Sequence, residues 1–173
     1  MVRLSSFAKY AASAKAAFTS RDAASTQQNL ATINAALTKL VTIVNGYEGG
    51  LLAASSISGQ EAALGQDIKN GIADAKASEV VSEAETDAII EYIRNTLAPN
   101  IQACMNALKG KKEQLAASGL QGTTLGDIGD MRAETNELGE ELVKKAPAAK
   151  QQDSRNALAT VDAVFADAIA FFS

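Results

Sequence analysis

The sequence has no histidine and no tryptophan, and its 173 residues include one cysteine and two prolines. Without histidine, the usual acid–base, metal-binding and nucleophile-activating groupings lose their most common member. The single Cys104 has no partner for a disulfide within the chain. These absences exclude most classes of enzyme and imply no cofactor. Carboxylates remain as potential catalytic groups, but we expect them to lie on solvated helix faces, as for Glu83, Glu85, Asp87 and Glu91.

The scarcity of proline is matched by an abundance of alanine, which forms about one residue in five. Alanine is the residue that is most easily held in a helix, and proline the least easily held. With 47% hydrophobic residues, the chain is also long enough to form one compact domain with a real core. The composition therefore predicts an all-α protein of a single domain.

An excess of positive charge is missing as well, since the net charge is -4 and the sequence pI is about 4.9. We find no stripe of lysine and arginine interleaved with aromatics that would neutralise phosphates, so no nucleic-acid partner is expected. No stretch reaches the roughly 18 apolar residues of a membrane span. We therefore expect no transmembrane segment.

The first 20 residues differ from the rest because they carry basic residues and no acidic one. Lys9 and Lys15 interrupt the apolar stretch between Phe7 and Phe18, which a secretory signal needs to be continuous. We interpret residues 1–20 as a degenerate signal or leader segment and residues 21–173 as the folded domain. The alternative is that the first segment forms an additional amphipathic helix.

After Arg21, apolar side chains recur at spacings of three and four residues along five stretches, which is the period of a helix with one buried face. The expected helices run from Asp22 to about Tyr47, from Leu51 to beyond Ala75, from Ser82 to Ser118, from Thr123 or Thr124 to Pro147, and from about Ala148 to Phe172. The glycines after the first helix favour its termination, because glycine readily adopts the left-handed conformation of helix ends. They are Gly46, Gly49 and Gly50.

Local signals refine two of these helices. Ser82 and Glu85 form a capping box, in which the serine side chain accepts from the Glu85 amide and the glutamate reaches back. Pro99 lies within the third apolar stripe, where it removes a backbone donor and crowds the preceding turn, so we expect a kink near Asn95.

Five amphipathic helices joined by short turns must bury their apolar stripes against one another, which predicts an antiparallel bundle of about five helices. Eight phenylalanine and tyrosine residues supply few bulky groups for its centre. An axial hydrophobic cavity is compatible with this composition, and so is a solid core in which small residues let the helices approach closely.

Two sets of short runs resemble the fungal hydrophobic surface binding protein A family, which includes the cell-wall galactomannoproteins. Those that match the opening of the family are Arg21–Ala24, Leu30–Asn34, Leu37–Leu40, Val44–Tyr47 and Gly49–Gly50. Those that match its second half are Leu97–Ile101, Leu108–Lys112, Gly119 and the segment with Thr135, Leu138, Leu142 and Pro147. The resemblance extends from about Arg21 to Phe172.

The resemblance implies an all-α domain, secreted or associated with the cell wall, that has no catalytic residues. It implies that the partner is a fatty acid or another apolar small molecule held inside the bundle. Two alternatives are adsorption to hydrophobic surfaces, as a coat or to recruit hydrolases, and a structural or antigenic role in the wall. An enzyme is the alternative of a different class, with no nucleophile motif to support it.

For a bound acyl chain, we expect contacts from residues in the middle of each stripe, where an axial cavity would be widest. These are Ile33, Leu37, Ile68, Ile72, Ile93, Leu97, Leu138, Val161 and Phe165. A carboxylate head group needs a donor at one mouth of the bundle. We expect this donor at the start of the fourth helix, where backbone amides and the hydroxyls of Thr123 and Thr124 are available.

Overall fold

Helices make up nearly all of the part of the chain that the computed structural model describes, residues 21–173, and no strand occurs within it. The elements are α2 (Arg21–Asn45), α3 (Leu51–Ala77), α4 (Glu83–Tyr92), the π-helical turn η1 (Ile93–Leu97), α5 (Ala98–Gly110), α6 (Lys112–Ala117), α7 (Gln121–Lys145), the 3-10 turn η2 (Ala148–Lys150) and α8 (Gln151–Phe172). The prediction of an all-α fold is confirmed.

The long helices of residues 21–173 form a closed arrangement. The α4, η1 and α5 segments follow one another without a loop and act as one rod, which we call the α4–α5 rod. Going around the bundle, α2 packs against α3, α3 against α7, α7 against α8, α8 against the rod, and the rod against α2. We call this arrangement the five-helix ring. It matches the expected bundle of about five helices.

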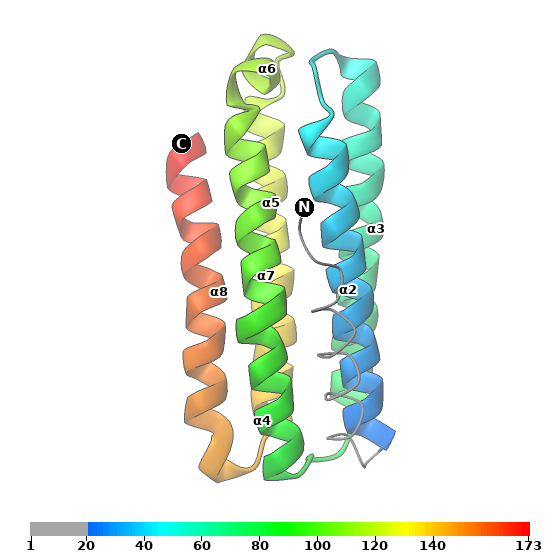
Figure 1. Ribbon diagram of the computed structural model, residues 1–173, viewed down its shortest axis with the longest axis vertical. Coiled ribbons are helices and arrows are strands. Elements are labelled where there is room, and N and C mark those ends of the chain that lie inside the picture. The colour runs from blue at the N-terminus through cyan, green and yellow to red at the C-terminus, as the bar shows by residue number, and fades with distance from the viewer. Residues whose placement is uncertain (1–20) are drawn as a thin grey trace, which may run out of the picture.

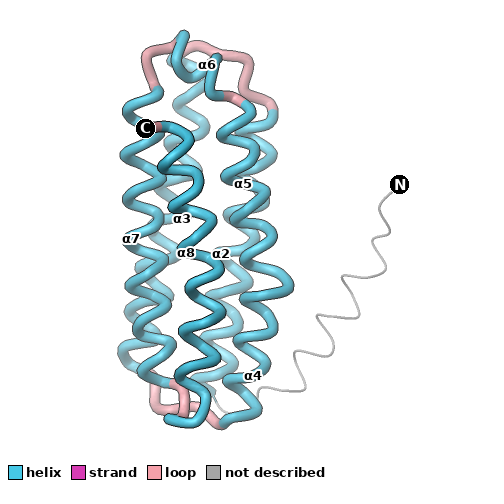
Figure 2. Tube along the Cα trace, turned by 90° about the vertical axis from the view of Figure 1, so that its left-hand side faces the viewer, coloured by secondary structure: helices cyan, strands magenta, loops and turns pink. Residues whose placement is uncertain are grey.

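Successive long helices run in opposite directions, so the chain passes up and down the bundle (Figure 1). The connecting segments lie at the two ends, with α6 at the same end as the link from α2 to α3 (Figure 2). The ring order differs from the chain order, because α7 lies between α3 and α8. Helices distant in sequence therefore share the interior of the ring.

The first helix, α2, ends at Asn45, close to the expected position. The described part of the chain begins within α2 at Arg21, so the interpretation of residues 1–20 as a leader lies outside the described residues. Its link to α3 contains Gly49 and Gly50 with φ of 110° and 90°. These positive values explain why glycine is needed at both positions.

The expected capping box at the start of α4 is present. The Glu85 amide donates to the Ser82 hydroxyl oxygen at 3.3 Å, and the Glu85 carboxylate accepts from the Ser82 amide at 2.9 Å. Two amides that the helix itself leaves without partners are thereby satisfied. The sequence signal for this helix start is confirmed. The expectation that Glu85 lies on a solvated face is wrong, because the capping box holds its side chain at 2% exposure.

The expected distortion near Asn95 takes the form of a π-helical turn. In η1 the Ala98 amide donates to the Ile93 carbonyl, five residues earlier instead of four. Pro99 follows directly, at the first turn of α5, where the absence of its N–H is tolerated. The wider turn is a known way for a helix to accommodate such an interruption.

The predicted third helix is interrupted after Gly110 by Lys111, and the short α6 follows. α6 ends at Ala117, and Gly119, two residues further on, has φ of 71°. The Leu120 amide donates to the Leu115 carbonyl at 2.8 Å, and the Gly119 amide to Ala116 at 2.9 Å. This is the hydrogen-bond pattern of a Schellman motif.

The expected capping role of Thr123 or Thr124 is wrong. The fourth helix, α7, starts earlier, at Gln121, with Leu120 at the capping position and no side-chain cap. The Schellman turn at Gly119 already redirects the chain, so both threonines fall within the first turn of α7. Thr124 is buried there and its amide donates to the Leu120 carbonyl, whereas Thr123 is exposed.

α7 packs tightly against Leu158 of α8 at a glycine, Gly139. A Cβ atom added to Gly139 would lie 2.8 Å from two methyl carbons of Leu158. Contacts this short require the leucine to move. By contrast, a Cβ atom at Gly126, on the same helix, would meet nothing within 4 Å.

We expect Gly139→Ala and Gly126→Ala to affect stability differently. Both changes add about 1 kcal/mol of helix propensity. Only Gly139→Ala also strains the contact with Leu158, at a cost of about 1–3 kcal/mol. The free energy of unfolding, measured with urea, should therefore be about 1–3 kcal/mol lower for Gly139→Ala than for Gly126→Ala. Equal stabilisation of both variants would show that α7 and α8 are not held together at Gly139.

Candidate hydrophobic ligand site

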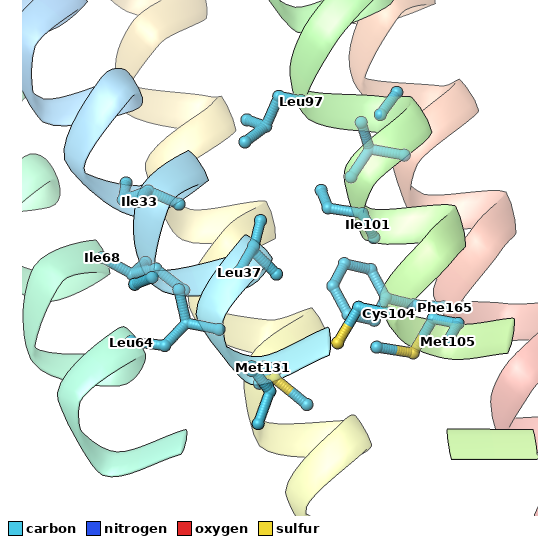
Figure 3. Packing of buried hydrophobic residues seen from close by; sticks show 14 of the residues in the cluster. Ile33, Leu37, Leu64, Ile68, Leu97, Ile101, Cys104, Met105, Met131 and Phe165 are labelled. Carbon is cyan, nitrogen blue, oxygen red and sulfur yellow. The ribbon is translucent and has the colours of Figure 1, made fainter. Parts of the chain in front are cut away.

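The nine apolar residues expected to contact an acyl chain all lie inside the five-helix ring. Each is at most 6% exposed, and all belong to one continuous hydrophobic cluster. Figure 3 labels five of them, with Ile33 and Leu37 of α2 across the interior from Leu97 of the α4–α5 rod and Phe165 of α8. The structure therefore brings the predicted residues together. Side chains, with no backbone between them, fill the space along the axis of the ring.

The interior also contains sulfur-bearing side chains that were not among the expected contacts. Cys104 and Met105 of α5 are fully buried, and Met131 of α7 is almost so. All three appear with Phe165 in the same part of the core (Figure 3). Methionine has flexible, unbranched chains that fill irregular spaces and rearrange easily. The helical spacing of Cys104, Met105 and Met131 in the sequence places all three on apolar stripes.

Cys104 behaves as a small hydrophobic residue, as its place on an apolar stripe suggests. Burial raises the pKa of its thiol to about 12, and the negative charge of Glu61 adds to this effect. A thiol with such a pKa stays protonated at neutral pH, and the thiolate is the reactive form. Cys104 is therefore inert in the folded protein.

A pair of carboxyl groups, Glu61 of α3 and Asp127 of α7, connects two neighbouring helices of the ring. Burial raises the pKa of Glu61 to about 7, and the charge of Asp127 and a hydrogen bond between the two side chains contribute in the same direction. Burial also raises the pKa of Asp127, a tendency that its hydrogen bond with Glu61 opposes and the charge of Asp130 increases. Two carboxyl groups in contact share a proton, because both cannot easily be ionised. Sequence analysis missed this pair, since nothing in the sequence aligns residues 66 positions apart.

A small enclosed hollow of about 20 Å³ lies near η2, at the end of the ring away from the Glu61–Asp127 pair. Its apolar lining includes Ile93, one of the nine expected contacts, together with Leu142 and Leu158. The polar lining consists of four hydroxyl side chains and one ammonium group. These are Thr26, Ser78, Thr86, Ser154 and Lys145. The hollow has room for about one water molecule.

A larger hollow, of about 460 Å³, is an open groove between α7 and α8. Its lining carries charged side chains, including Glu140, Arg155 and Asp162. The Asp162 carboxylate accepts from Arg132 at 2.6 and 2.8 Å. An acyl chain has no reason to leave the ring interior for such a polar surface.

No group of side chains in residues 21–173 has the composition and arrangement to hold a metal ion. Within the same residues, no helix is long and apolar enough to cross a membrane. The features that remain for ligand binding are the apolar interior of the ring and the polar groups near its two ends.

The family described as hydrophobic surface binding protein A matches residues 23–144 of the chain. Among solved structures, AfMP4p in complex with palmitic acid has a TM-score of 0.83 and 30% sequence identity, and the match covers 87% of this chain and 99% of that one. Two ligand binding domains of the Penicillium marneffei MP1 protein, both complexed with arachidonic acids, have TM-scores of 0.82. Domain 1 is 20% identical, and the match covers 88% of this chain and 99% of that domain. Domain 2 is 22% identical, and the match covers 90% of this chain and 99% of that domain. No curated protein matches the sequence significantly.

The Glu61–Asp127 pair predicts that stability depends on pH. Between about pH 4.5 and 7, Glu61 ionises in the unfolded chain but keeps its proton in the folded one, so folding becomes less favourable as the pH rises. The full effect is about 3 kcal/mol at most. Glu61→Gln cannot ionise and still donates a hydrogen bond. We expect this variant to be as stable as the parent at pH 4 and more stable at pH 8, as measured by urea unfolding.

Asp67→Asn is a matched control for this experiment, since it removes a carboxylate from the same helix, α3, without touching the pair. Its stability should follow the pH dependence of the parent. If Glu61→Gln and the parent lost stability in parallel from pH 4 to pH 8, the pair would not be the origin of the dependence.

Proposed function

The chain belongs to the hydrophobic surface binding protein A family, and from this premise we propose that it binds a long-chain fatty acid or a similar lipid inside the five-helix ring. The observation that carries the proposal is the ring interior, where the apolar stripes of all five helices meet. A relative with 30% identity, AfMP4p, has the same fold and a structure in complex with palmitic acid. The apolar interior and the palmitic acid complex of this relative support the same class of ligand.

The energetics of transfer support an interior site. Each methylene removed from water contributes about 0.8 kcal/mol, so burying about a dozen of them contributes about 10 kcal/mol towards opening the filled core. A long acyl chain can therefore displace side chains that a short one cannot. Met105 and Met131 are suited to such movement, because their side chains have several rotatable bonds and no branches.

The second candidate function is adsorption to hydrophobic surfaces, and exposed apolar side chains favour it. Leu51 and Leu52 begin α3, and Leu52 is 89% exposed. Val80 and Phe171 are exposed as well, although they lie away from α3's first turn. These side chains form no continuous face, so we rank adsorption below binding in the ring interior.

Our proposal includes no catalytic role, and it leaves a structural or antigenic role as the remaining alternative. The family resemblance favours a secreted or wall-associated protein. Residues 1–20 would then be a leader that the folded domain, residues 21–173, does not need.

We expect Leu97→Trp to abolish palmitate binding, because the larger ring fills the interior where the acyl chain would lie. The matched control is Leu52→Trp, which adds the same group at an exposed position. Retained ligand after purification in the presence of palmitate, measured by native mass spectrometry, should be one molecule per chain for the parent and the control and none for Leu97→Trp.

Circular dichroism and urea unfolding accompany this experiment, because the added volume at Leu97 is expected to reduce stability by about 1–3 kcal/mol. A folded Leu97→Trp that still carries one palmitate would contradict binding in the interior. If the parent itself retained no lipid but adsorbed to apolar beads, adsorption would be the better description.

Deleting residues 1–20 should leave cooperative unfolding and palmitate binding unchanged, because the ring of residues 21–173 is complete without them. Urea unfolding followed by circular dichroism tests this expectation. A large loss of stability would identify the deleted segment as an integral part of the bundle.

A further inference from the structure

The two ends of α7 place opposite charges near the ring interior. Thr124 lies in the first turn, three residues before Asp127, and residues with this spacing are neighbours on a helix surface. Asp127 and its partner Glu61 therefore place two carboxyl groups close to the N-terminal end of α7. Lys145 is the last residue of α7. At 1.5 Å per residue, Thr124 and Lys145 are about 30 Å apart along the helix.

Lys145 is the one charged side chain that lines the enclosed hollow, among the residues that the structure describes. Its Nζ donates to the Lys76 carbonyl at 3.1 Å and to the Ser78 carbonyl. These bonds hold the ammonium group at the C-terminal end of α3. An ammonium has three hydrogens, so one is left for a further acceptor. No carboxylate of residues 21–173 forms an ion pair with Lys145. Glu141 pairs with the neighbouring Lys144, and the charge of Lys145 adds to the lowering of the Glu141 pKa that this pairing causes.

The hydroxyl groups of the hollow can also serve a ligand. The Ser78 hydroxyl donates to the Asp74 carbonyl, which the Ser78 amide also contacts. The Thr86 hydroxyl likewise donates to the Ser82 carbonyl, which accepts from the Thr86 amide. If either hydroxyl turned towards a ligand, the carbonyl would keep its amide partner. Such a hydroxyl can donate to an anion without leaving a buried group unsatisfied.

We propose that this hollow is the head-group end of the ligand site, and that Lys145 binds the carboxylate of a long-chain fatty acid there. The inference rests on the proposed function. It adds the orientation of the bound lipid and the preference of the site for an anionic head group. Ile93 lines the hollow, and Leu97 lies one helical turn further along the α4–α5 rod. The acyl chain extends from the hollow past these two residues into the ring. At the opposite end, expected earlier to hold the head, an anion would meet Asp127 and Glu61.

The first test compares an acid and an alcohol of equal chain length, dodecanoate and dodecan-1-ol, at pH 8 by isothermal titration calorimetry. Lys145→Gln keeps a hydrogen-bond donor but removes the charge. We expect it to weaken dodecanoate binding about tenfold, because a charge-assisted hydrogen bond is lost. The affinity for dodecan-1-ol should stay within about twofold of that of the parent. Lys144→Gln is the matched control and should change neither affinity. Lys145→Arg should restore most of the dodecanoate affinity.

The outcomes separate the two proposals. If the parent bound neither compound, the proposed function and this inference would both fail. If the parent bound dodecanoate and Lys145→Gln did not weaken it, or weakened acid and alcohol equally, only the head-group assignment would be overturned.

A second measurement needs no variant and locates the head group directly. Nuclear Overhauser effects are recorded between [2-13C]dodecanoate and the threonine methyl groups of the parent protein. We expect contacts to the methyl group of Thr86, in the hollow, and none to that of Thr124. Contacts to Thr124 would place the carboxylate at the other end of the ring and overturn the proposal.

Discussion

Closure of five helices into a ring is the constraint on which the rest of this structure depends. Each long helix packs mainly against two neighbours, so no backbone occupies the axis and side chains alone must fill it. Protein interiors are packed as densely as organic crystals, and a ring of this size therefore needs large or adaptable side chains at its centre. Phe165, Met105 and Met131 supply them. The same requirement makes the axis the place where an acyl chain can substitute for protein atoms.

Polar interactions are concentrated between neighbouring helices, where they fix the position of one helix relative to another. The Gln60 side chain donates to the Ala36 carbonyl at 3.2 Å, and the side-chain amide of Asn100 donates to the side-chain oxygen of Asn34 at 2.6 Å. Breaking such buried bonds leaves a polar group without a partner, which costs more than the bond contributes. The apolar centre has no comparable directional bonds. The ring can thus keep its helix order while its interior adapts.

Much of this fold could be predicted from periodicity, and the exceptions have physical causes. The stripes gave the long helices, and Ser82 with Glu85 marked a helix start because both partners lie within one turn. The prediction that Thr123 or Thr124 caps the fourth helix was wrong, because a Schellman turn at Gly119 can precede a helix that has no side-chain cap. The nine interior residues were predictable from their spacing. The Glu61–Asp127 pair and the Lys145 hollow were not, since each depends on which helices become neighbours.

The ring gives a lipid site a direction, although its apolar stripes alone would not. An acyl chain in a uniformly apolar tube could enter with either end first, because methylene groups make no directional contacts. Polar groups at the ends remove this equivalence. Glu61 and Asp127 share a partly buried seam near one end, and this burial already opposes their ionisation, so an added anion there would increase the electrostatic cost. Lys145 lies at the other end, where a carboxylate would gain an opposite charge. The difference in charge between two short segments of α7 is thus the physical basis of the orientation that we propose for a ligand that otherwise contacts hydrocarbon.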